Sequence, residues 1–563
     1  MVNVKNLFGM AVMATALVGC SSSDDLTPNG NEGNQTGAAY ASFRINLPTT
    51  SGTRADDPTP GTPSFDEGTA KEYEVKNGTI LIFDKDGKYV TSAQLGTMNP
   101  WTPVKTDGVT TAAITTVQLS GVKVGGNYQA LVLLNNDVDA TTSKVTLPAT
   151  GTPYATWSAK ASNVNAEKYA STDGIFMANA PMYTGTTTEP TTLVPIANVC
   201  ASREEAQAKV ATTVYVERGL AKVTMQNFTD GGYTVAEGTY KNDKVEIKNW
   251  QLDVTNKSTF PVHQTGDLST GFTAIWSTPR FYDGGNQSFK RVYWGVDPNY
   301  SGATLQNLEA CKKAFTMIGK NDIKGKTGND HPQYCLENTF DLSNMMQGQT
   351  TRVVFKAVYT PKALEGTTEK TFYKIGNNTA IWKEADLKQQ IKTVALNAMK
   401  ITDAAEQAKY VVKLDATENN ISGAAGQHLI KAENITYTGD AADDKVSPTV
   451  VNTINEKLGL SEAAGIATYL DGVTYYIARI KHFNELTPWT AGEGYGTKND
   501  KYLGRYGVLR NNWYDLSVTS ISGLGYPEVP EVKPTVPDDE NEQYINVEVK
   551  ILSWAKRSQS IVL

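Results

Sequence analysis

The chain has 563 residues, of which 40% are hydrophobic, and a formal net charge of −7 at pH 7. This length is too great for one ordinary hydrophobic core, so we expect two or three domains. A mildly acidic chain lacks the clustered basic face that nucleic acid requires, which excludes nucleic acid as a partner. Thr, Val, Tyr, Asn and Gly are abundant, and these residues favour strands and the turns between them.

The chain begins with a short apolar run, Leu7–Val18, after a basic start that contains Lys5. The run is too short to span a bilayer, and its layout is that of a secretory signal. The sequence Leu17-Val18-Gly19-Cys20 resembles the lipobox of bacterial lipoproteins. The resemblance implies that residues 1–19 are a lipoprotein signal peptide and that acylated Cys20 anchors the precursor to a membrane. The alternative is an ordinary signal peptide with a chance cysteine.

The first strand is expected at Ala41–Leu47, after a polar tether. Phe43, Ile45 and Leu47 fall on one face and polar residues on the other, which is typical of a half-buried strand. The loop Pro48–Pro58 follows, is rich in chain breakers and carries Arg54. Exposed loops of this kind are preferred sites of proteolysis.

Several strands are expected further along. Gly78–Phe83 leads into a turn at Asp84-Lys85-Asp86-Gly87, for which a hairpin is favoured over a calcium loop because the later calcium ligands are missing. Tyr128–Leu134 is a continuous apolar run typical of a central strand, and Thr212–Met225 is also strand-like. The polar turn Gly238–Asp243 is the predicted domain boundary.

The second half combines helices and strands. Helices are predicted at Ala303–Met317 and Ala385–Met399; in the latter Leu387, Ile391, Val394 and Ala398 share one face. The remaining elements are the strands Arg352–Tyr359 and Trp513–Ile521, a hairpin at Asp471-Gly472 within Ile466–Ile480, a Pro-rich linker at Tyr526–Glu542 and the closing strand Tyr544–Leu552. The last residues, Ser553–Leu563, are also strand-like.

The sequence shows no catalytic constellation, so we expect no enzymatic activity, no cofactor and no metal site. The four histidines are scattered, and no nucleophile elbow, P-loop or dinucleotide fingerprint occurs. Cys311 and Cys335 could form a disulfide in an oxidising compartment, or both could be free buried thiols; spacing alone leaves both alternatives open.

Three local sequences then point to a family. Arg510–Val518, Val547–Trp554 and Val216–Val223 are similar to strands of the fimbrillins of Bacteroidales, the type V pilins. Their order, together with the N-terminal signals, most resembles the main shaft subunit of the short fimbriae. Residues 362–449 match no part of this pattern and are interpreted as a subunit-specific insertion.

The resemblance implies a mainly β fold with two transthyretin-like β-sandwich domains and a few short helices. The expected divisions are a lipidated propeptide at 20–54, an N-terminal domain at 55–238 and a C-terminal domain at 239–563. The C-terminal domain includes the Pro-rich linker 526–542 and a candidate donor strand at 553–563.

The resemblance also implies a mechanism of assembly. A trypsin-like or Arg-specific protease cuts between Arg54 and Ala55 at the cell surface, and the strand with Phe43, Ile45 and Leu47 leaves its sheet. The last eleven residues of another copy fill the groove, and the linker lets them swing out. The inward side chains of this donor would be Gln559, Ile561 and Leu563.

The expected product is a fimbria that serves adhesion, colonisation and biofilm formation. Its partners would be further copies of the chain, anchor and tip subunits, the maturation protease and surface ligands that the sequence does not identify. One alternative is a tip or accessory subunit. Another is a surface lipoprotein that binds glycans through exposed aromatic residues such as Trp157, Trp382 or Trp489.

Overall fold

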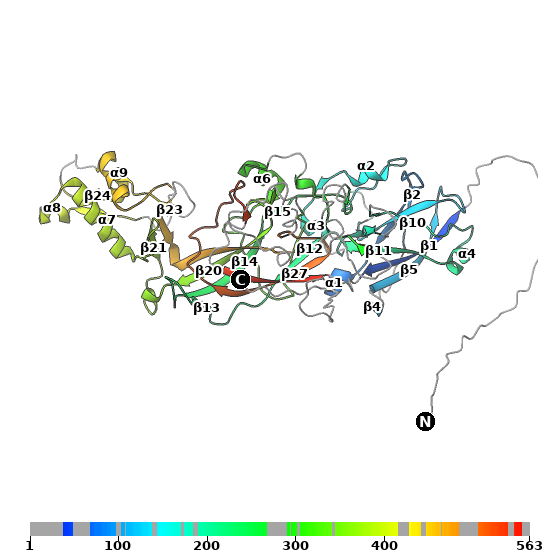
Figure 1. The fold of residues 1–563 in the computed structure, drawn as a ribbon, viewed down its shortest axis with the longest axis horizontal. Helices are drawn as coiled ribbons and strands as arrows, with labels where there is room; N and C mark the ends of the chain where they lie inside the picture. Colours follow the sequence, from blue (N-terminus) through cyan, green and yellow to red (C-terminus); the bar gives the residue numbers. More distant parts are fainter. Residues whose placement is uncertain are drawn as a thin grey trace, which may run out of the picture. The chain divides into compact units, whose positions relative to one another are not determined.

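The fold is that of a computed structural model (Figure 1). It describes residues 38–48, 68–96, 103–106, 109–137, 143–170, 174–183, 190–266, 290–292, 294–300, 305–339, 344–414, 427–440, 446–462, 464–482, 505–538 and 545–553. Among these residues, no helix is both long and apolar enough to cross a membrane.

The N-terminal part is built on one large sheet that curls over on itself. Its strands follow the order β3 (Tyr89–Gln94), β2 (Gly78–Asp84), β6 (Tyr128–Leu134), β8 (Met177–Asn179), β11 (Thr212–Arg218), β1 (Ala39–Pro48), β5 (Val109–Leu119) and β4 (Pro103–Thr106), and β10 (Val194–Pro195) pairs with β6.

Alternation along β2 explains how both faces of this sheet are buried. Ile80 and Ile82 share a core cluster with Phe43 of β1, although three strands separate β2 from β1 in the sheet. Leu81 and Phe83 point to a second cluster on the other face. The Thr115 hydroxyl of β5 donates to the carbonyl of Leu95, just after β3, at 2.9 Å, which closes the curl.

The predicted central strand and hairpin of this part are confirmed. Tyr128–Leu134 is β6, with partners on both sides. β2 and β3 form an antiparallel pair across the Asp84–Gly87 turn. The Asp84 carboxylate accepts hydrogen bonds from the backbone of Asp86 and Lys88, and Gly87 has φ 74°. The backbone donors of the turn are therefore hydrogen-bonded within the turn.

The C-terminal part is a β-sandwich of two four-stranded sheets. One has the order β19 (Gln333–Cys335), β12 (Ala221–Met225), β27 (Asn512–Ile521) and β28 (Ile545–Ser553); the other has β13 (Tyr233–Thr234), β14 (Lys244–Asp253), β20 (Arg352–Thr360) and β26 (Val473–Arg479). Trp250, Phe355 and Tyr514 belong to the core shared by the two sheets. The prediction of a mainly β fold with β-sandwiches is confirmed.

The strand-like stretch Thr212–Met225 divides between the two parts of the molecule. β11 pairs with β8 and β1, whereas β12 pairs with β19 and β27, so the chain changes sheet at Gly219-Leu220. A Cβ at Gly219 would lie 2.9 Å from the Phe176 ring, so the close packing at the crossing requires glycine. The predicted boundary at Gly238–Asp243 comes after β12, and the division into domains stays a prediction.

An inserted module, defined here as residues 361–472, separates β20 from β26. It contains β21 (Phe372–Ile375), α7 (Glu384–Met399), α8 (Ala404–Ala408), β22 (Tyr410–Val412), β23 (Gln427–His428), β24 (Ile435–Tyr437), α9 (Pro448–Lys457) and β25 (Ile466–Tyr469). The predicted helix Ala385–Met399 is α7, whose Leu387 and Ile391 are buried in a core that the module makes for itself.

The predicted hairpin at Asp471-Gly472 is wrong. β25 pairs with β21 and β23 of the module, whereas β26 pairs with β20 of the sandwich. Asp471 and Gly472 do have positive φ, at 52° and 74°, as a tight turn requires. The turn passes the chain from one sheet to another and joins no pair of neighbouring strands.

Short elements connect these sheets. The predicted helix Ala303–Met317 is reduced to α6 (Leu308–Ala314), because the Asn307 side chain caps its start and the chain extends again at Phe315. The remaining elements are α1 (Ala70–Tyr73), α2 (Tyr154–Ser158), α3 (Ala166–Tyr169), α4 (Arg203–Ala208), β7 (Ser162–Asn163), β9 (Met182–Tyr183), β15 (Thr255–Asn256), β16 (Ser258–Thr259), β17 (Lys290–Arg291) and β18 (Phe315–Thr316), with 3₁₀ turns at Pro298–Tyr300, Lys362–Leu364, Ala432–Asn434 and Leu470–Gly472.

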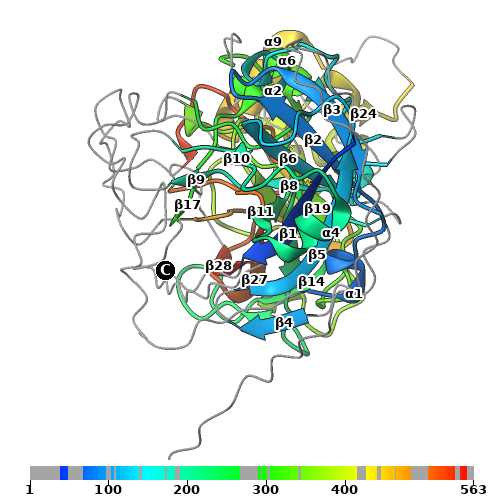
Figure 2. The ribbon, with the colours of Figure 1, turned by 90° about the vertical axis from the view of Figure 1, so that its right-hand side faces the viewer.

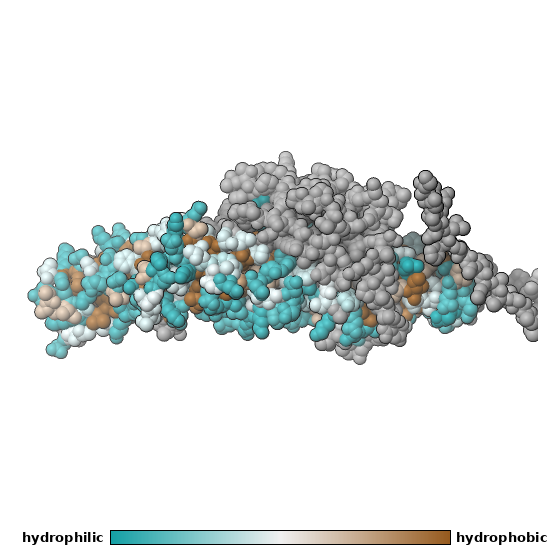
Figure 3. All heavy atoms as spheres, turned by 90° about the horizontal axis from the view of Figure 1, so that it is seen from below, coloured by the Kyte–Doolittle hydropathy of each residue, from teal (hydrophilic) through white to brown (hydrophobic). Residues whose placement is uncertain are grey.

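The surface of the described residues is largely polar. Figure 3 shows hydrophobic side chains scattered between hydrophilic ones on the face in view. Among the described residues, the exposed large hydrophobic side chains are Ile114, Val124, Val210, Val411 and Leu470.

Candidate functional site

The first strand of the described chain is inserted between two others. β1 runs antiparallel to β5, from Ala39 opposite Leu119 to Pro48 opposite Val109. On its other side it runs parallel to β11, with Phe43 opposite Thr212 and Asn46 opposite Tyr215. Figure 2 shows β1 between these two strands. The strand predicted at Ala41–Leu47 is therefore confirmed, and both of its edges are paired.

One face of β1 fills the N-terminal core. Ala39, Ala41, Phe43 and Ile45 are fully buried and pack with residues of β2, β6 and β11. Burying a side chain of the size of Phe43 or Ile45 contributes about 1.5–3 kcal/mol. The side chain of Leu47, the third residue of the predicted set, lies outside the described residues. β1 thus plugs an apolar groove.

The other face of β1 is covered more than the sequence predicts. The Ser42 hydroxyl donates to the carbonyl of Ala206 in α4 at 2.7 Å and lies 2.7 Å from the Thr116 hydroxyl. The Arg203 guanidinium of α4 donates to the carbonyl of Thr116 at 2.9 Å and lies over the Tyr40 ring. Of the predicted polar face, Arg44 is exposed, whereas Ser42 is buried.

The sequence reasoning missed α4, although a signal for it exists. The Ser202 hydroxyl accepts a hydrogen bond from the backbone of Glu205, and the Glu205 carboxylate accepts one from the backbone of Ala201. A serine followed three residues later by a glutamate is the usual signature of a helix start. This short helix lies over β1, so its contacts help to hold the strand in the sheet.

Removing β1 would leave two kinds of unsatisfied surface. The core residues that contact Phe43 and Ile45 would be exposed to water, and the facing backbone groups of β5 and β11 would lose their partners. A groove with open strand edges is a template for another strand. In this structure β1 occupies the groove, so neither surface is exposed.

The chain's closing strand stays in its own sandwich. β28 forms an antiparallel pair with β27, from Asn512 opposite Ser553 to Ile521 opposite Ile545, and it is the last strand of its sheet. The strand predicted at Tyr544–Leu552 is found as β28, Ile545–Ser553, paired within the sandwich. The predicted donor residues Gln559, Ile561 and Leu563 lie outside the described residues, as do the predicted lipidation site Cys20 and the predicted cleavage site at Arg54 and Ala55.

The three sequences that resemble fimbrillins meet in space. The Asn511 side chain accepts a hydrogen bond from the backbone of Arg218 at 3.1 Å, and the Asn511 backbone donates to Leu220 at 2.7 Å. β27 lies between β12 and β28. The similarity therefore covers one continuous structural element, the crossing from the first sheet to the second and the strands beside it.

The prediction of a Pro-rich linker that swings out is wrong over Tyr526–Asp538, defined here as the strap. Tyr526 exchanges two backbone hydrogen bonds of 2.8 Å with Tyr475 of β26. Arg352 of β20 donates to the carbonyl of Pro530 at 2.8 Å, and the Asp538 carboxylate is buried against Arg479. The prolines extend the chain, and these contacts fasten it to the sandwich.

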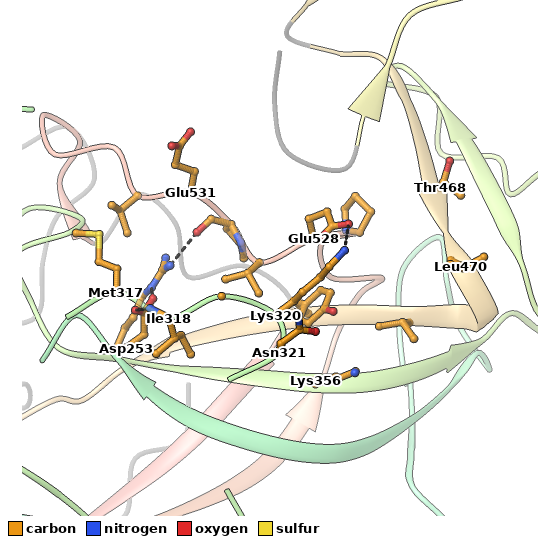
Figure 4. Close-up of a pocket in the computed structure, with 18 of the residues that line it drawn as sticks. Asp253, Met317, Ile318, Lys320, Asn321, Lys356, Thr468, Leu470, Glu528 and Glu531 are labelled. Atoms are coloured by element: carbon orange, nitrogen blue, oxygen red, sulfur yellow. Dashed lines mark hydrogen bonds and ion pairs between the residues drawn. The ribbon is translucent and has the colours of Figure 1, made fainter. Parts of the chain in front are cut away.

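The strap borders an open pocket of about 820 Å³ above β20 and β26. Figure 4 shows Glu528 of the strap and Lys320 pointing toward one another, and their charged atoms lie 3.5 Å apart. Lys356 and Glu531 also line the pocket. Charges of both signs border this pocket, and the strap is one of its walls.

The disulfide that the sequence allowed between Cys311 and Cys335 is not formed, and the alternative of free buried thiols holds. Cys311 packs with Phe315, whereas Cys335 belongs to the sandwich core with Trp250. Burial raises the pKa of Cys311 to about 11 and that of Cys335 to about 12. Both groups are therefore protonated at neutral pH and poorly reactive.

The histidines and tryptophans have structural surroundings. Nδ1 of His263 lies 2.7 Å from the Glu217 carboxylate, with both side chains buried. Within the described stretches, no three His, Cys, Asp or Glu side chains gather as metal ligands. The glycan-binding alternative requires Trp157 to be exposed, but its side chain is buried and donates to the carbonyl of Thr146. Trp382 packs against the module core, and Trp489 lies outside the described residues.

These features define a β-sandwich protein whose N-terminal strand fills a groove and whose closing strand completes a separate sheet. Residues 467–560 match the family described as major fimbrial subunit protein type IV, Fimbrillin, C-terminal. This C-terminal part of the chain is therefore similar to the fimbrillins, in agreement with the predicted resemblance.

Several solved structures have a distant similarity to this chain. A candidate cell adhesion protein from Parabacteroides distasonis ATCC 8503 is 10% identical, with a TM-score of 0.39, over 91% of this chain and 97% of that chain. The tip fimbrial protein Mfa3 from Porphyromonas gingivalis is 12% identical, with a TM-score of 0.30, over 92% and 100%. These similarities are too low to carry a functional argument. A search of curated proteins found no match.

Proposed function

We propose that this chain is a structural subunit of a cell-surface fimbria that assembles by strand replacement. One observation carries the proposal: β1 is a terminal strand that plugs a groove of its own sheet, with both edges paired and its apolar face buried. The match to the fimbrillin family supports the same function.

The trigger is cleavage between Arg54 and Ala55 by an Arg-specific protease. Before the cut, acylated Cys20 anchors the precursor at the outer membrane. After the cut, the strand leaves with the lipid and the tether, and β5 and β11 accept residues 554–563 of another copy. Donor and acceptor surfaces differ, so the contact is heterologous and repeats into a filament. Anchor and tip subunits would end it, and adhesion, colonisation and biofilm formation would follow.

The strap restricts how the donor moves. Since the chain is fastened as far as Asp538 and β28 pairs with β27, the part of the C-terminus that remains to reach another copy begins after Ser553. The donor is thus a short extension of a fixed strand. A fixed origin lowers the entropy lost on binding, because fewer residues have to be ordered.

The decisive experiment is cleavage of the purified precursor by trypsin. We expect N-terminal sequencing to find Ala55 and electron microscopy to find filaments. Arg54→Ala should block both, whereas Arg44→Ala, which changes an exposed arginine of β1, should leave both intact. A chain without residues 554–563 should be cut and remain monomeric. Filaments from that truncated chain, or an acylated Cys20 on the assembled subunit, would contradict the proposal.

A further inference from the structure

A buried ion pair lies at the start of the chain that would remain after cleavage. Glu72 belongs to α1, and Nζ of Lys222 in β12 lies 2.8 Å from one of its carboxylate oxygens and 3.0 Å from the other. Both side chains are 1% exposed. A buried charge pair of this kind is sensitive to the removal of either partner, since the remaining charge has no water.

Glu72 accepts three further hydrogen bonds, two at its carboxylate and one at its backbone carbonyl. The Tyr334 hydroxyl of β19 donates to it at 2.7 Å, and the backbone of Thr69 donates at 2.7 Å. The Arg218 side chain donates to the Glu72 carbonyl at 3.0 Å. Burial, and next the Glu72 carboxylate, raise the pKa of Tyr334, so its hydroxyl remains a donor. Residues of the first sheet, the crossing and the second sheet thus meet at Glu72.

The pair also rests on the C-terminal sheet. Nζ of Lys222 lies 3.6 Å from the centre of the Trp513 ring in β27, which adds a cation–π contact to the ion pair. Trp513 is fixed in turn, because its ring nitrogen donates to the Thr224 hydroxyl at 2.7 Å. The ammonium group therefore has little freedom to follow Glu72 if α1 moves.

Between Glu72 and β2, the backbone has a second support. The Asn135 side chain donates to the carbonyl of Glu74 at 2.9 Å and accepts from the backbone of Lys76 at 2.8 Å. Beyond these residues β2 begins, with β3 and β6 on its two sides. Residues 68–77 are the part of the chain between the proposed cut and this strand that the structure describes.

We propose that Glu72 anchors the new N-terminal segment, so that the departure of β1 does not spread into β2. This inference rests on the proposed function, because it assigns Glu72 a role in the cut protein. Before the cut, residues 49–67 join residues 68–77 to β1, so the chain on this side has little conformational freedom to gain by leaving the fold. After the cut the segment has a free end, and free ends fray unless side chains hold them. Glu72 is thus a positioning residue for assembly.

The test is hydrogen–deuterium exchange of the peptide 68–77 in the uncut and the cut protein. A specific protease site placed within residues 55–67 makes the cut independent of Arg54. We expect the parent chain and the control E74Q, which changes an exposed carboxylate two residues away, to keep the peptide protected after the cut. In E72Q it should exchange more than about tenfold faster after the cut, with little change before it.

Two further variants keep the test decisive if E72Q fails to fold. E72Q/K222M removes both buried charges, and Y334F removes a single hydrogen bond; each should speed exchange only after the cut, Y334F by the smaller factor. Loss of protection in the cut parent chain, or unchanged protection in E72Q/K222M, would overturn the anchor. If the natural chain is not cut at Arg54 but the engineered cut gives the expected pattern, the proposed function fails and the anchor stands.

Discussion

Phe43 and Arg44 are neighbours on β1 and have opposite surroundings, since Phe43 is fully buried and Arg44 is exposed. Phe43→Ala should lower the free energy of unfolding of the uncut precursor by about 3–5 kcal/mol, because it leaves a cavity in the N-terminal core. Arg44→Ala should change it by less than about 0.5 kcal/mol. Urea unfolding before and after cleavage measures both. If β1 leaves, the two variants should unfold alike after the cut, and a persistent difference would show that β1 stays.

The two thiols with raised pKa allow a prediction on pH. In the folded protein Cys335 keeps its proton up to a pKa of about 12, whereas in the unfolded chain it loses it near the ordinary 9.0. Its contribution to stability is therefore complete below about pH 9 and is lost as the pH rises toward 12. Cys335→Ala should reduce the fall of the free energy of unfolding between pH 8.5 and 10, measured by urea titration.

Iodoacetamide at pH 8 should modify Cys311 and Cys335 only after denaturation, and rapid labelling of the native protein would contradict their burial.

At the scale of residues, the sequence predicts which side chains of a strand face the core but not which distant charges pair. Alternation sufficed for Phe43 and Ile45. Glu72 and Lys222 are 150 positions apart, and neither lies in a pattern that marks a buried charge. Their pairing depends on two sheets meeting, which is a property of the tertiary fold.

At the scale of elements, one of the contacts that fasten the strap is a buried ion pair. The Asp538 carboxylate lies 2.7 Å from Nε of Arg479, and both side chains are almost fully buried. Asp538→Asn should destabilise the protein by about 3–5 kcal/mol, because it removes the negative charge that lies against this buried arginine. Glu531→Gln, at an exposed position of the same strap, is the matched control. Thermal unfolding and the rate of proteolysis within 526–538 provide the measurements, and equal behaviour of the two variants would contradict the strap's anchoring role.

The inserted module allows a prediction on whether the sandwich can fold without it. The backbone of Gly376 donates to the carbonyl of Gly465 at 3.0 Å, next to the paired residues Ile375 and Ile466. Replacing residues 377–464 by an Asn-Gly turn should leave the sandwich folded, with Tm lowered by less than about 5 °C. Replacing all of 361–470 should unfold it, because Phe372 and Tyr469 belong to the sandwich core. Circular dichroism during heating distinguishes these outcomes, and loss of structure in the shorter deletion would show that the module core supports the sandwich.

Element boundaries show where periodicity is informative and where it fails. The boundaries of β6 and nearly those of α7 follow from local pattern, because each is regular and long enough to bury one face or both. Thr212–Met225 has a continuous strand pattern, yet it serves two sheets, since periodicity records burial and not the identity of the neighbouring strand. The same limit explains the error at Asp471-Gly472, where the turn chemistry is right and the pairing is different.

For the whole molecule, composition and the family resemblance predict β-sandwiches, and the structure confirms them. The sequence also predicts a removable first strand, and β1 has the place in its sheet that such a strand needs. It does not predict α4 over β1 or the attachment of the strap, because both depend on contacts between segments far apart in the chain. The C-terminal extension is thereby limited to the residues after β28.

The crossing at Gly219-Leu220 has a mechanical consequence. If one copy's end is held between β5 and β11 of the next, a pull along the filament enters the subunit at β11 and passes through covalent bonds into β12. From there it reaches β27 and then β28, which is paired with β27 at nine positions. A pull along β28 loads these bonds in shear, so they share the tension and do not open one after another. The subunit would thus resist stretching along one short path, and the inserted module, which lies off that path, would carry little of the force.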